Sequence, residues 1–282
     1  MCELLVNEVF NSVLTTPTSE IFDYLETFLE NFGYVTYAYS EESYLVMGPK
    51  DLDNAVVGLV CHVDTVGDIQ NTLPRVYSDI TNPDLLVSAG TYCLDDRTGV
   101  AIALSNLFAS PVYIFTKGEE VGCAGAITLI EDYPELEMVF GDRHNIHCLI
   151  EVDRKGVDEV VFYELDYPEF EQQFTNYEKN LSAAWTDVCI LGPMWDVASA
   201  NVSAAFYKEH SSFEHSSRLD IETATKKLRN TIEIFKNRAE QNLPAFKYRG
   251  KSSTCCMLLL AHNHEEPKED FSLGEEVLEG VF

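Results

Sequence analysis

The residues best suited to chemistry in this chain are histidines and acids that follow apolar runs. His62 and Asp64 come directly after the apolar run 59–61, with one residue between them. Side chains two apart share a face of a strand, so both would project beyond the same strand end. A carboxylate beside a histidine fixes the tautomer of the imidazole and raises its basicity, which suits a metal ligand. Taken alone, the pair also fits a polar turn at a strand end.

The same arrangement recurs along the chain. Asp95-Asp96, Glu119-Glu120 and Asp153 each follow an apolar run, and His210 follows another. In open α/β sheets, sites form outside the carboxyl ends of the strands. Two imidazoles and four or more carboxylates gathered there would repel one another without a countercharge. A dinuclear metal centre would supply that charge, and these ligand types suit zinc, with cobalt or manganese as alternatives.

Each segment also has a structural interpretation. Asp95-Asp96 could cap a following helix, because acids favour helix N-termini. Glu119-Glu120 could form a solvated turn, and Asp153 could simply pair with Arg154. These alternatives weaken any one segment more than they weaken the whole set.

Hydrophobic periodicity predicts the elements that would position these residues. Helices are predicted over 1–14, 19–31 (with Thr18 as its cap), 100–108, 124–131, 167–184 and 221–239. Strands are predicted at 34–39, 43–47, 85–88, 111–116, 145–152, 160–164 and 199–205, with another ending at His62. Residues 186–191 are expected to be extended, and 253–261 to form a strand or helix. Strands alternating with helices favour an α/β layer structure.

Composition limits the class of protein. The 282 residues are 46% hydrophobic, enough for a large core. We expect one catalytic domain over 1–245 and an acidic C-terminal extension over 246–282. No apolar run approaches the roughly 18–20 residues of a membrane span. The 47 acids against 19 bases give a net charge of −28, which argues against nucleic-acid or anionic-membrane partners.

Cysteine usage indicates a reducing compartment. None of the eight cysteines forms a C-x-x-C pair, and several lie in apolar runs. We therefore expect reduced core cysteines and no cysteine-based zinc site. The N-terminus lacks the basic region of a signal peptide, so a cytoplasmic location is expected.

The ordered set of motifs resembles the co-catalytic di-zinc exopeptidases, which include zinc aminopeptidases, peptidase T and related deacylases. The resemblance implies a three-layer α/β/α fold with a central mixed, mostly parallel sheet. Any one motif is weak, whereas the order of five across residues 62–210 is specific. The motifs are His62-Val63-Asp64-Thr65-Val66, Leu94-Asp95-Asp96-Arg97-Thr98-Gly99, Thr116-Lys117-Gly118-Glu119-Glu120-Val121-Gly122, Glu151-Val152-Asp153-Arg154 and Tyr207-Lys208-Glu209-His210.

The resemblance also implies a ligand set for two zinc ions. His62 and Asp153 would bind the first ion, Glu120 and His210 the second, and Asp95 would bridge both. His215 stands in the same polar loop as His210 and is the alternative last ligand. We favour His210 because it matches the position of the last histidine of the family.

Two further residues would act without binding metal. Asp64 would orient His62, and Glu119 would be the general base. In the implied mechanism, two ions at about 3.5–4 Å hold a bridging water and lower its pKa. Glu119 takes the proton as hydroxide attacks the carbonyl and then passes it to the leaving nitrogen.

The leading functional hypothesis is an aminopeptidase acting on short peptides. Two enzyme alternatives use the same site: a deacylase or amidase of small N-acyl compounds, and a carboxypeptidase with Arg97 or Arg154 holding the terminal carboxylate. A third alternative is a catalytically silent binding protein on a hydrolase scaffold. Assembly into a homo-oligomer is left open.

The sequence departs from the family in three ways, one of which is an acidic C-terminal tail with no counterpart that we can place. Lys117-Gly118 precedes the glutamate pair where the family often has another acid or polar residue. Only 56 residues separate Asp153 from His210, which leaves no room for an inserted lid domain. We therefore expect the compact form of the fold.

Overall fold

The computed structural model describes residues 2–52, 55–66, 76–79, 81–88, 93–134, 146–163, 165, 167–181 and 184–250. Residues 1–251 form one compact unit. That unit extends slightly past the expected boundary at 245, because Phe246 is buried and its ring packs 5.3 Å from that of Tyr167. The remainder of the expected acidic extension, with the element expected at 253–261, lies outside the described residues.

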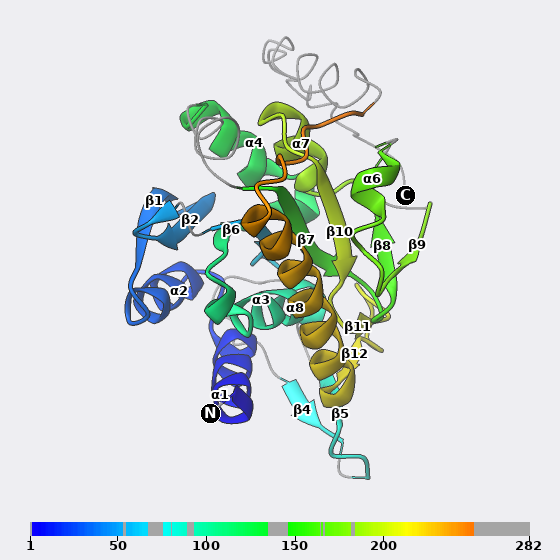
Figure 1. The fold of residues 1–282 in the computed structure, drawn as a ribbon. Coiled ribbons are helices and arrows are strands. Elements are labelled where there is room, and N and C mark those ends of the chain that lie inside the picture. The colour runs from blue at the N-terminus through cyan, green and yellow to red at the C-terminus, as the bar shows by residue number, and fades with distance from the viewer. Residues whose placement is uncertain are drawn as a thin grey trace, which may run out of the picture. The chain divides into compact units, whose positions relative to one another are not determined.

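A mixed eight-stranded sheet forms the centre of the fold (Figure 1). Its strand order is β1-β2-β6-β3-β7-β10-β8-β9, and four of the seven neighbouring pairs are parallel. The strands are β1 (Tyr34–Ser40), β2 (Tyr44–Pro49), β3 (Val57–His62), β6 (Val112–Thr116), β7 (Cys148–Arg154), β8 (Glu159–Val161), β9 (Glu178–Lys179) and β10 (Ser199–Ser203). The central strands β6, β3 and β7 run parallel, so their carboxyl ends meet at one edge of the sheet.

Helices cover both faces of this sheet, which gives the three-layer α/β/α arrangement expected from the sequence (Figure 1). One face carries α1 (Cys2–Thr15), α2 (Ile21–Glu30), α3 (Leu94–Leu104) and α8 (Arg218–Glu240), whose buried side chains share one core with alternate strand residues. Helices α4 (Ala124–Asp132) and α7 (Val188–Met194) pack against the other face. The segment between Asp153 and His210 adds strands to the same sheet and leaves the described fold compact.

The fold also has a smaller antiparallel sheet of four strands, whose order across the sheet is β11-β12-β5-β4. Its strands are β4 (Val76–Ser78), β5 (Leu85–Ser88), β11 (Phe206–Tyr207) and β12 (His215–Ser217). Only β5 was expected from the sequence. The other three have two or three residues each, too few for an alternating pattern to be recognised.

Two expected elements are wrong. The helix expected over 167–184 is one turn, α6 (Pro168–Glu171), followed by β9. The helical spacing there comes from Phe170 and Phe174, whose rings pack against Phe235 in a compact aromatic cluster. The extended segment expected over 186–191 is instead helix α7, because a short buried apolar run fits either structure.

The expected cap at Thr18 is also wrong. Helix α2 begins after Glu20 and has no side-chain cap. The hydroxyl of Thr18 instead accepts a hydrogen bond from Nη2 of Arg97, at 3.0 Å. In the described part of the chain, none of the helices combines the length and the apolar character needed to cross a membrane.

Candidate metal centre

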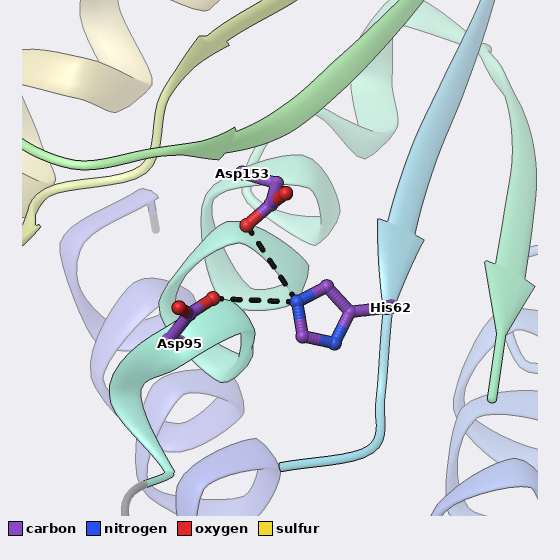
Figure 2. A group of neighbouring side chains, drawn as sticks. All are labelled: His62, Asp95 and Asp153. Carbon is purple, nitrogen blue, oxygen red and sulfur yellow. Dashed lines mark hydrogen bonds and ion pairs between the residues drawn. The ribbon is translucent and has the colours of Figure 1, made fainter. Parts of the chain in front are cut away.

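His62 stands at the carboxyl end of β3 and is 1% exposed. Its Nε2 lies 3.3 Å from Oδ1 of Asp95 and 3.6 Å from Oδ1 of Asp153 (Figure 2). Its Nδ1 lies 3.0 Å from the backbone oxygen of Asp64. A proton donated from Nδ1 to that oxygen leaves the lone pair of Nε2 directed at the two carboxylates.

A second group of side chains shares Asp95 with the first. Nε2 of His210 lies 3.2 Å from Oδ2 of Asp95 and 2.9 Å from Oε1 of Glu120. The two oxygens of Asp95 therefore face different histidines. His62, Asp95 and Asp153 form one group that could hold a cation, and Asp95, Glu120 and His210 form another.

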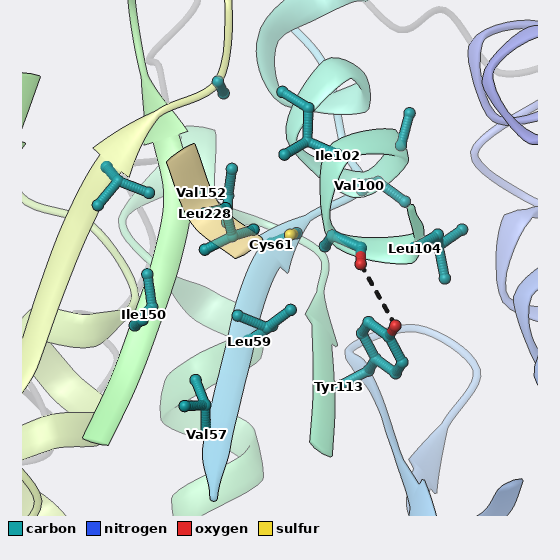
Figure 3. Packing of buried hydrophobic residues seen from close by; sticks show 14 of the residues in the cluster. Val57, Leu59, Cys61, Val100, Ile102, Leu104, Tyr113, Ile150, Val152 and Leu228 are labelled. Atoms are coloured by element: carbon teal, nitrogen blue, oxygen red, sulfur yellow. Dashed lines mark hydrogen bonds between the residues drawn. The ribbon is translucent and has the colours of Figure 1, made fainter. Parts of the chain in front are cut away.

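The packing of α3 on the sheet fixes where Asp95 lies. Residues of α3 including Val100, Ile102 and Leu104 pack over β3 and β7 in a continuous apolar core (Figure 3). The helix approaches β7 so closely that a Cβ on Gly99 would lie 1.9 Å from the backbone oxygen of Val152. Only glycine allows this approach, which brings the start of α3 to the carboxyl ends of the central strands.

The start of α3 is irregular in a way that divides the roles of its two acids. Asp95 and Asp96 have non-helical backbone angles, and the peptide bond between them is cis. Oδ1 of Asp96 accepts a hydrogen bond from the amide of Gly99 at 3.1 Å and so caps the regular helix. Asp95 is left to face the two histidines. Capping and site formation are thus separate tasks of adjacent residues.

Glu119 and Glu120 follow β6 in a short 3-10 turn, η3 (Glu119–Val121). Gly118 and Gly122 bracket the turn with φ of 84° and 98°, values that favour glycine. The amides of Glu119 and Glu120 point at the carboxylate of Asp64, at 3.3 and 3.4 Å. Asp64 therefore links the end of β3 to the glutamate pair.

The contact between Asp64 and His62 differs from the expected one. The carboxylate oxygen Oδ1 lies 3.5 Å from Nδ1 of His62, farther than the backbone oxygen of the same residue. The backbone oxygen is the better acceptor for the imidazole proton, because 3.0 Å is a normal hydrogen-bond length. The carboxylate acts mainly on the turn that carries Glu119 and Glu120.

Asp153 is fixed by neighbours on β10 and before α7. Its amide donates to Oδ1 of Asn201 at 3.0 Å, and the hydroxyl of Thr186 donates to its Oδ2 at 3.1 Å. Arg154 pairs with Glu159 at 2.9 Å. The expected alternative, an isolated pair of Asp153 with Arg154, does not match these contacts.

The two candidate histidines are directed differently: His210 lies in the loop between β11 and β12, and His215 is the first residue of β12. His210 reaches Asp95 and Glu120, as described above. Nδ1 of His215 lies 2.8 Å from the backbone oxygen of Phe213, and its ring stacks on Tyr207 at 5.3 Å. His210 is therefore the histidine that lies beside the carboxylates.

Burial and mutual charge shift the pKa values of the groups in this centre. Burial raises the pKa of Glu119 to about 9, with a further contribution from Asp153. Burial and Asp95 raise the pKa of Glu120 to about 7. Hydrogen bonding to Asp95 raises the pKa of His210 to about 9, although burial opposes this shift.

The first group shows the same pattern. Burial opposes ionisation of His62, but the nearby carboxylates of Asp153, Asp64 and Asp95 raise its pKa well above the ordinary value. Burial likewise opposes ionisation of Asp95, yet His210 and His62 lower its pKa to about 2. These side chains are arranged to stabilise positive charge between them.

The donor set could hold divalent cations. In each group the nitrogen and oxygen donors lie within 4.8 Å of one another. The two groups share the carboxylate of Asp95, which offers one oxygen to each. A third overlapping group, His62, Glu119 and Glu120, places Glu119 next to both. Imidazole and carboxylate donors suit zinc, cobalt or manganese. A divalent cation there would favour ionised carboxylates and neutral imidazoles.

Arg97 does not have the role of a cation for a substrate carboxylate, which the carboxypeptidase alternative would give it. Its side chain is 0% exposed. Its Nε donates to the backbone oxygen of Val63 at 2.8 Å, and Nη1 donates to those of Val13 and Thr16 at 3.0 and 3.1 Å. Arg97 thus ties the start of α3 to β3 and to the end of α1, and it is not available to a substrate.

Several residues that build the centre were not expected from the sequence. Thr186 and Asn201 hold Asp153, and Glu214 accepts hydrogen bonds from the backbone next to Asp95. They are distant in sequence from the residues they contact, so local spacing gives no signal for them. Only the position of Glu214 four residues after His210 hinted that it belongs to this loop.

Comparison with known proteins places the fold. No family model and no curated protein sequence matches this chain. The aminopeptidase PepT from Bacillus cereus has a TM-score of 0.61 and 12% identity, and the match covers 84% of this chain and 99% of that chain. A tripeptidase from Staphylococcus aureus has a TM-score of 0.62, 12% identity and the same 84% and 99% coverage.

A third similar structure is an assembly-forming peptidase. The TET1 peptidase from Pyrococcus horikoshii, which can assemble into a tetrahedron or a large octahedral shell, has a TM-score of 0.54 and 11% identity. That match covers 80% of this chain and 98% of that chain. At these identities the likeness is one of fold. The chain has the peptidase T-like α/β fold, which confirms the fold expected from its motifs.

Proposed function

We propose that this chain is a metal-dependent exopeptidase of the aminopeptidase type. The observation that carries the proposal is the pair of metal-ligand groups sharing Asp95, with Glu119 beside them, on a peptidase T-like fold. His62 and Asp153 would hold the first ion, Glu120 and His210 the second, and Asp95 both. Two zinc ions suit these donors, and cobalt or manganese could replace them.

The residues divide the work of peptide hydrolysis between them. Bound metal would polarise the scissile carbonyl and make water a better nucleophile. Glu119 lies beside both principal groups, in the third group with His62 and Glu120. Burial raises its pKa, and a bound divalent cation would favour the ionised form that a base needs. Glu119 would accept the proton of the attacking water and deliver it to the leaving nitrogen.

The surroundings of the arginines favour an aminopeptidase over a carboxypeptidase. A carboxypeptidase needs a cation that reaches the terminal carboxylate of its substrate. Arg97 is buried against backbone oxygens, and Arg154 pairs with Glu159 at 2.9 Å. An acid-rich centre instead attracts the free amine of a peptide, because opposite charges at short range stabilise each other. A deacylase or amidase remains the second candidate, since its chemistry is the same.

A substrate comparison tests the proposal directly. We expect zinc-loaded protein to release the first residue of short peptides with a free N-terminus, and N-acetylation of the same peptides to abolish cleavage. Product analysis by mass spectrometry would show which end is shortened. Cleavage of the acetylated peptides alone would indicate a deacylase or amidase. Absence of all hydrolysis in protein that holds two metal ions would favour a silent binding protein.

The net charge and the cysteines of the chain support a proposal for its partners and its location. The net charge of −28 opposes nucleic-acid and anionic-membrane partners. The proposed chemistry would act on peptides or small N-acyl compounds. The buried thiols of Cys61, Cys123 and Cys148 form no disulfide in the described structure, which would fit a reducing cytoplasm. The assemblies formed by the TET1 peptidase make a homo-oligomer a reasonable expectation for this fold, which size-exclusion chromatography with light scattering would test.

Replacing Asp64 with asparagine should weaken the site without destroying it. The amide keeps one oxygen for the turn that carries Glu119 and Glu120, but it loses the negative charge near His62. Loss of such an outer contact costs about 10- to 100-fold in metal affinity or activity. Measurements of kcat and of zinc affinity by chelator competition would check this. Wholly neutral behaviour of Asp64→Asn would refute the supporting role.

A further inference from the structure

Glu214 is a buried carboxylate that the proposed mechanism does not use. It lies in the loop between β11 and β12, four residues after His210, and is 0% exposed. Its Oε2 accepts hydrogen bonds from the hydroxyl of Ser88 at 2.8 Å and from the amide of Leu94 at 3.0 Å. Its Oε1 faces the amide of Asp95 at 3.4 Å. The three described donors to its carboxylate, from Ser88, Leu94 and Asp95, thus lie just before or at the start of α3.

The amides of Leu94 and Asp95 stand in the first turn of α3, where a helix supplies no acceptor for its own N–H groups. Asp95 and Asp96 also have non-helical backbone angles. The amides of Leu94 and Asp95 are instead received by Glu214. Glu214 contacts Ser88 through two hydrogen bonds. Its carboxylate accepts one from the Ser88 hydroxyl, and its backbone oxygen accepts one from the Ser88 amide at 3.4 Å. These hydrogen bonds to Glu214 hold the backbone of Asp95 from outside helix α3.

The same residue is tied to His210 through the loop. The amide of Glu214 donates to the backbone oxygen of Ser211 at 3.0 Å, and the hydroxyl of Ser211 donates to the backbone oxygen of Lys208 at 2.6 Å. His210 sits inside this bonded turn with a φ of 57°. A displacement of Glu214 would therefore move His210 and Asp95 relative to each other.

We propose that Glu214 is a positioning residue that sets the shared carboxylate of Asp95 against His210 and so determines the affinity of the second metal. This inference rests on the proposed function. The first group should depend on it less, because His62 and Asp153 are held by β3, β7 and β10 without Glu214. A carboxylate suits this position because it only accepts hydrogen bonds, and three donors converge on the two oxygens of Glu214.

The test is a cobalt titration of the full chain followed by electronic absorption. Glu214→Gln keeps the size of the side chain but places an amide N–H₂ where two backbone N–H groups and a hydroxyl need acceptors. We expect two binding events in the wild type. In Glu214→Gln the second event should weaken by about 10- to 100-fold with an altered cobalt spectrum, while the first changes little. Glu222→Gln, an exposed change of equal charge on α8, should titrate like the wild type.

Thermal unfolding separates positioning from a purely structural role. If Glu214 only stabilised the fold, Glu214→Gln would melt earlier without metal and still titrate like the wild type, which would overturn the inference. If Glu214→Gln does not fold, Ser88→Ala removes one donor and leaves the carboxylate in place. It should weaken the second event by a few-fold, and an unchanged titration would again overturn the inference. Failure of the wild type to bind a second cobalt ion would instead contradict the proposed function.

Discussion

Replacing Glu119 with glutamine should lower kcat for peptide hydrolysis by about 10²- to 10⁴-fold, the usual contribution of a general acid–base residue. The amide is almost isosteric and cannot accept a proton from the attacking water. The ligand atoms of the two groups that share Asp95 are unchanged, so metal content should stay at that of the wild type. Single-turnover kinetics together with elemental analysis would separate the loss of proton transfer from a loss of metal.

The matched control is Glu222→Gln on α8, where the side chain is half exposed and pairs with Lys226 at 3.3 Å. It removes the same charge far from the proton that must be moved, so kcat should be unchanged. Turnover retained in Glu119→Gln would remove Glu119 from the mechanism. Loss of zinc together with activity would mean that Glu119 is a ligand, as its place in the third group allows.

The core of the fold was predictable from the sequence because burial imposes short, regular patterns. The strand ending at His62 is buried along its full length, and its apolar run is continuous in the sequence. Helix α8 is amphipathic, with Leu228, Ile232 and Phe235 on its buried side, and its helical spacing is equally clear. A short element that is buried on all sides, such as α7, has no hydrophobic period that would distinguish a helix from a strand.

The candidate site was predictable to the extent that its residues stand at strand ends. Motif order across the chain suggested that His62, Asp95 and Asp153 meet, and the structure places them together. The supports of these residues could not be found in this way. Glu214 contacts Leu94 from 120 residues away, and Arg97 reaches back 84 residues to Val13. Such contacts depend on the tertiary arrangement and leave no periodic or spacing signal.

Arg97 illustrates how a charged residue near a site can mislead. Beside Asp95 and Asp96 in sequence, it suggested a cation that could receive a substrate carboxylate. In the fold its guanidinium donates hydrogen bonds to the backbone oxygens of Val63, Val13 and Thr16. A buried arginine needs such acceptors, because an unpaired buried charge is strongly destabilising. The sequence shows the charge but not the direction in which it points.

Asp95→Asn should have the largest effect on metal content of any single substitution in the centre. Asp95 is the carboxylate common to both principal groups, with Oδ1 3.3 Å from His62 and Oδ2 3.2 Å from His210. The neutral amide offers one weak oxygen donor in place of two charged ones. We expect metal content to fall from two ions per chain to below one, and kcat/KM to fall by about 10³-fold or more, because metal supplies several kcal/mol of transition-state stabilisation.

The comparison that makes this result specific is with Glu120→Gln, which alters a ligand of the second group but leaves His62, Asp95 and Asp153 intact. It should lose one ion, whereas Asp95→Asn should keep less than one per chain. Asp196→Asn, an exposed change beside Lys247, should keep two ions and full activity. Metal-dependent thermal shifts provide an independent measure, since an ion that binds only the folded state raises its stability. If Asp95→Asn still bound two ions, the two groups could not be joined through this carboxylate, and the centre would have to be two separate sites.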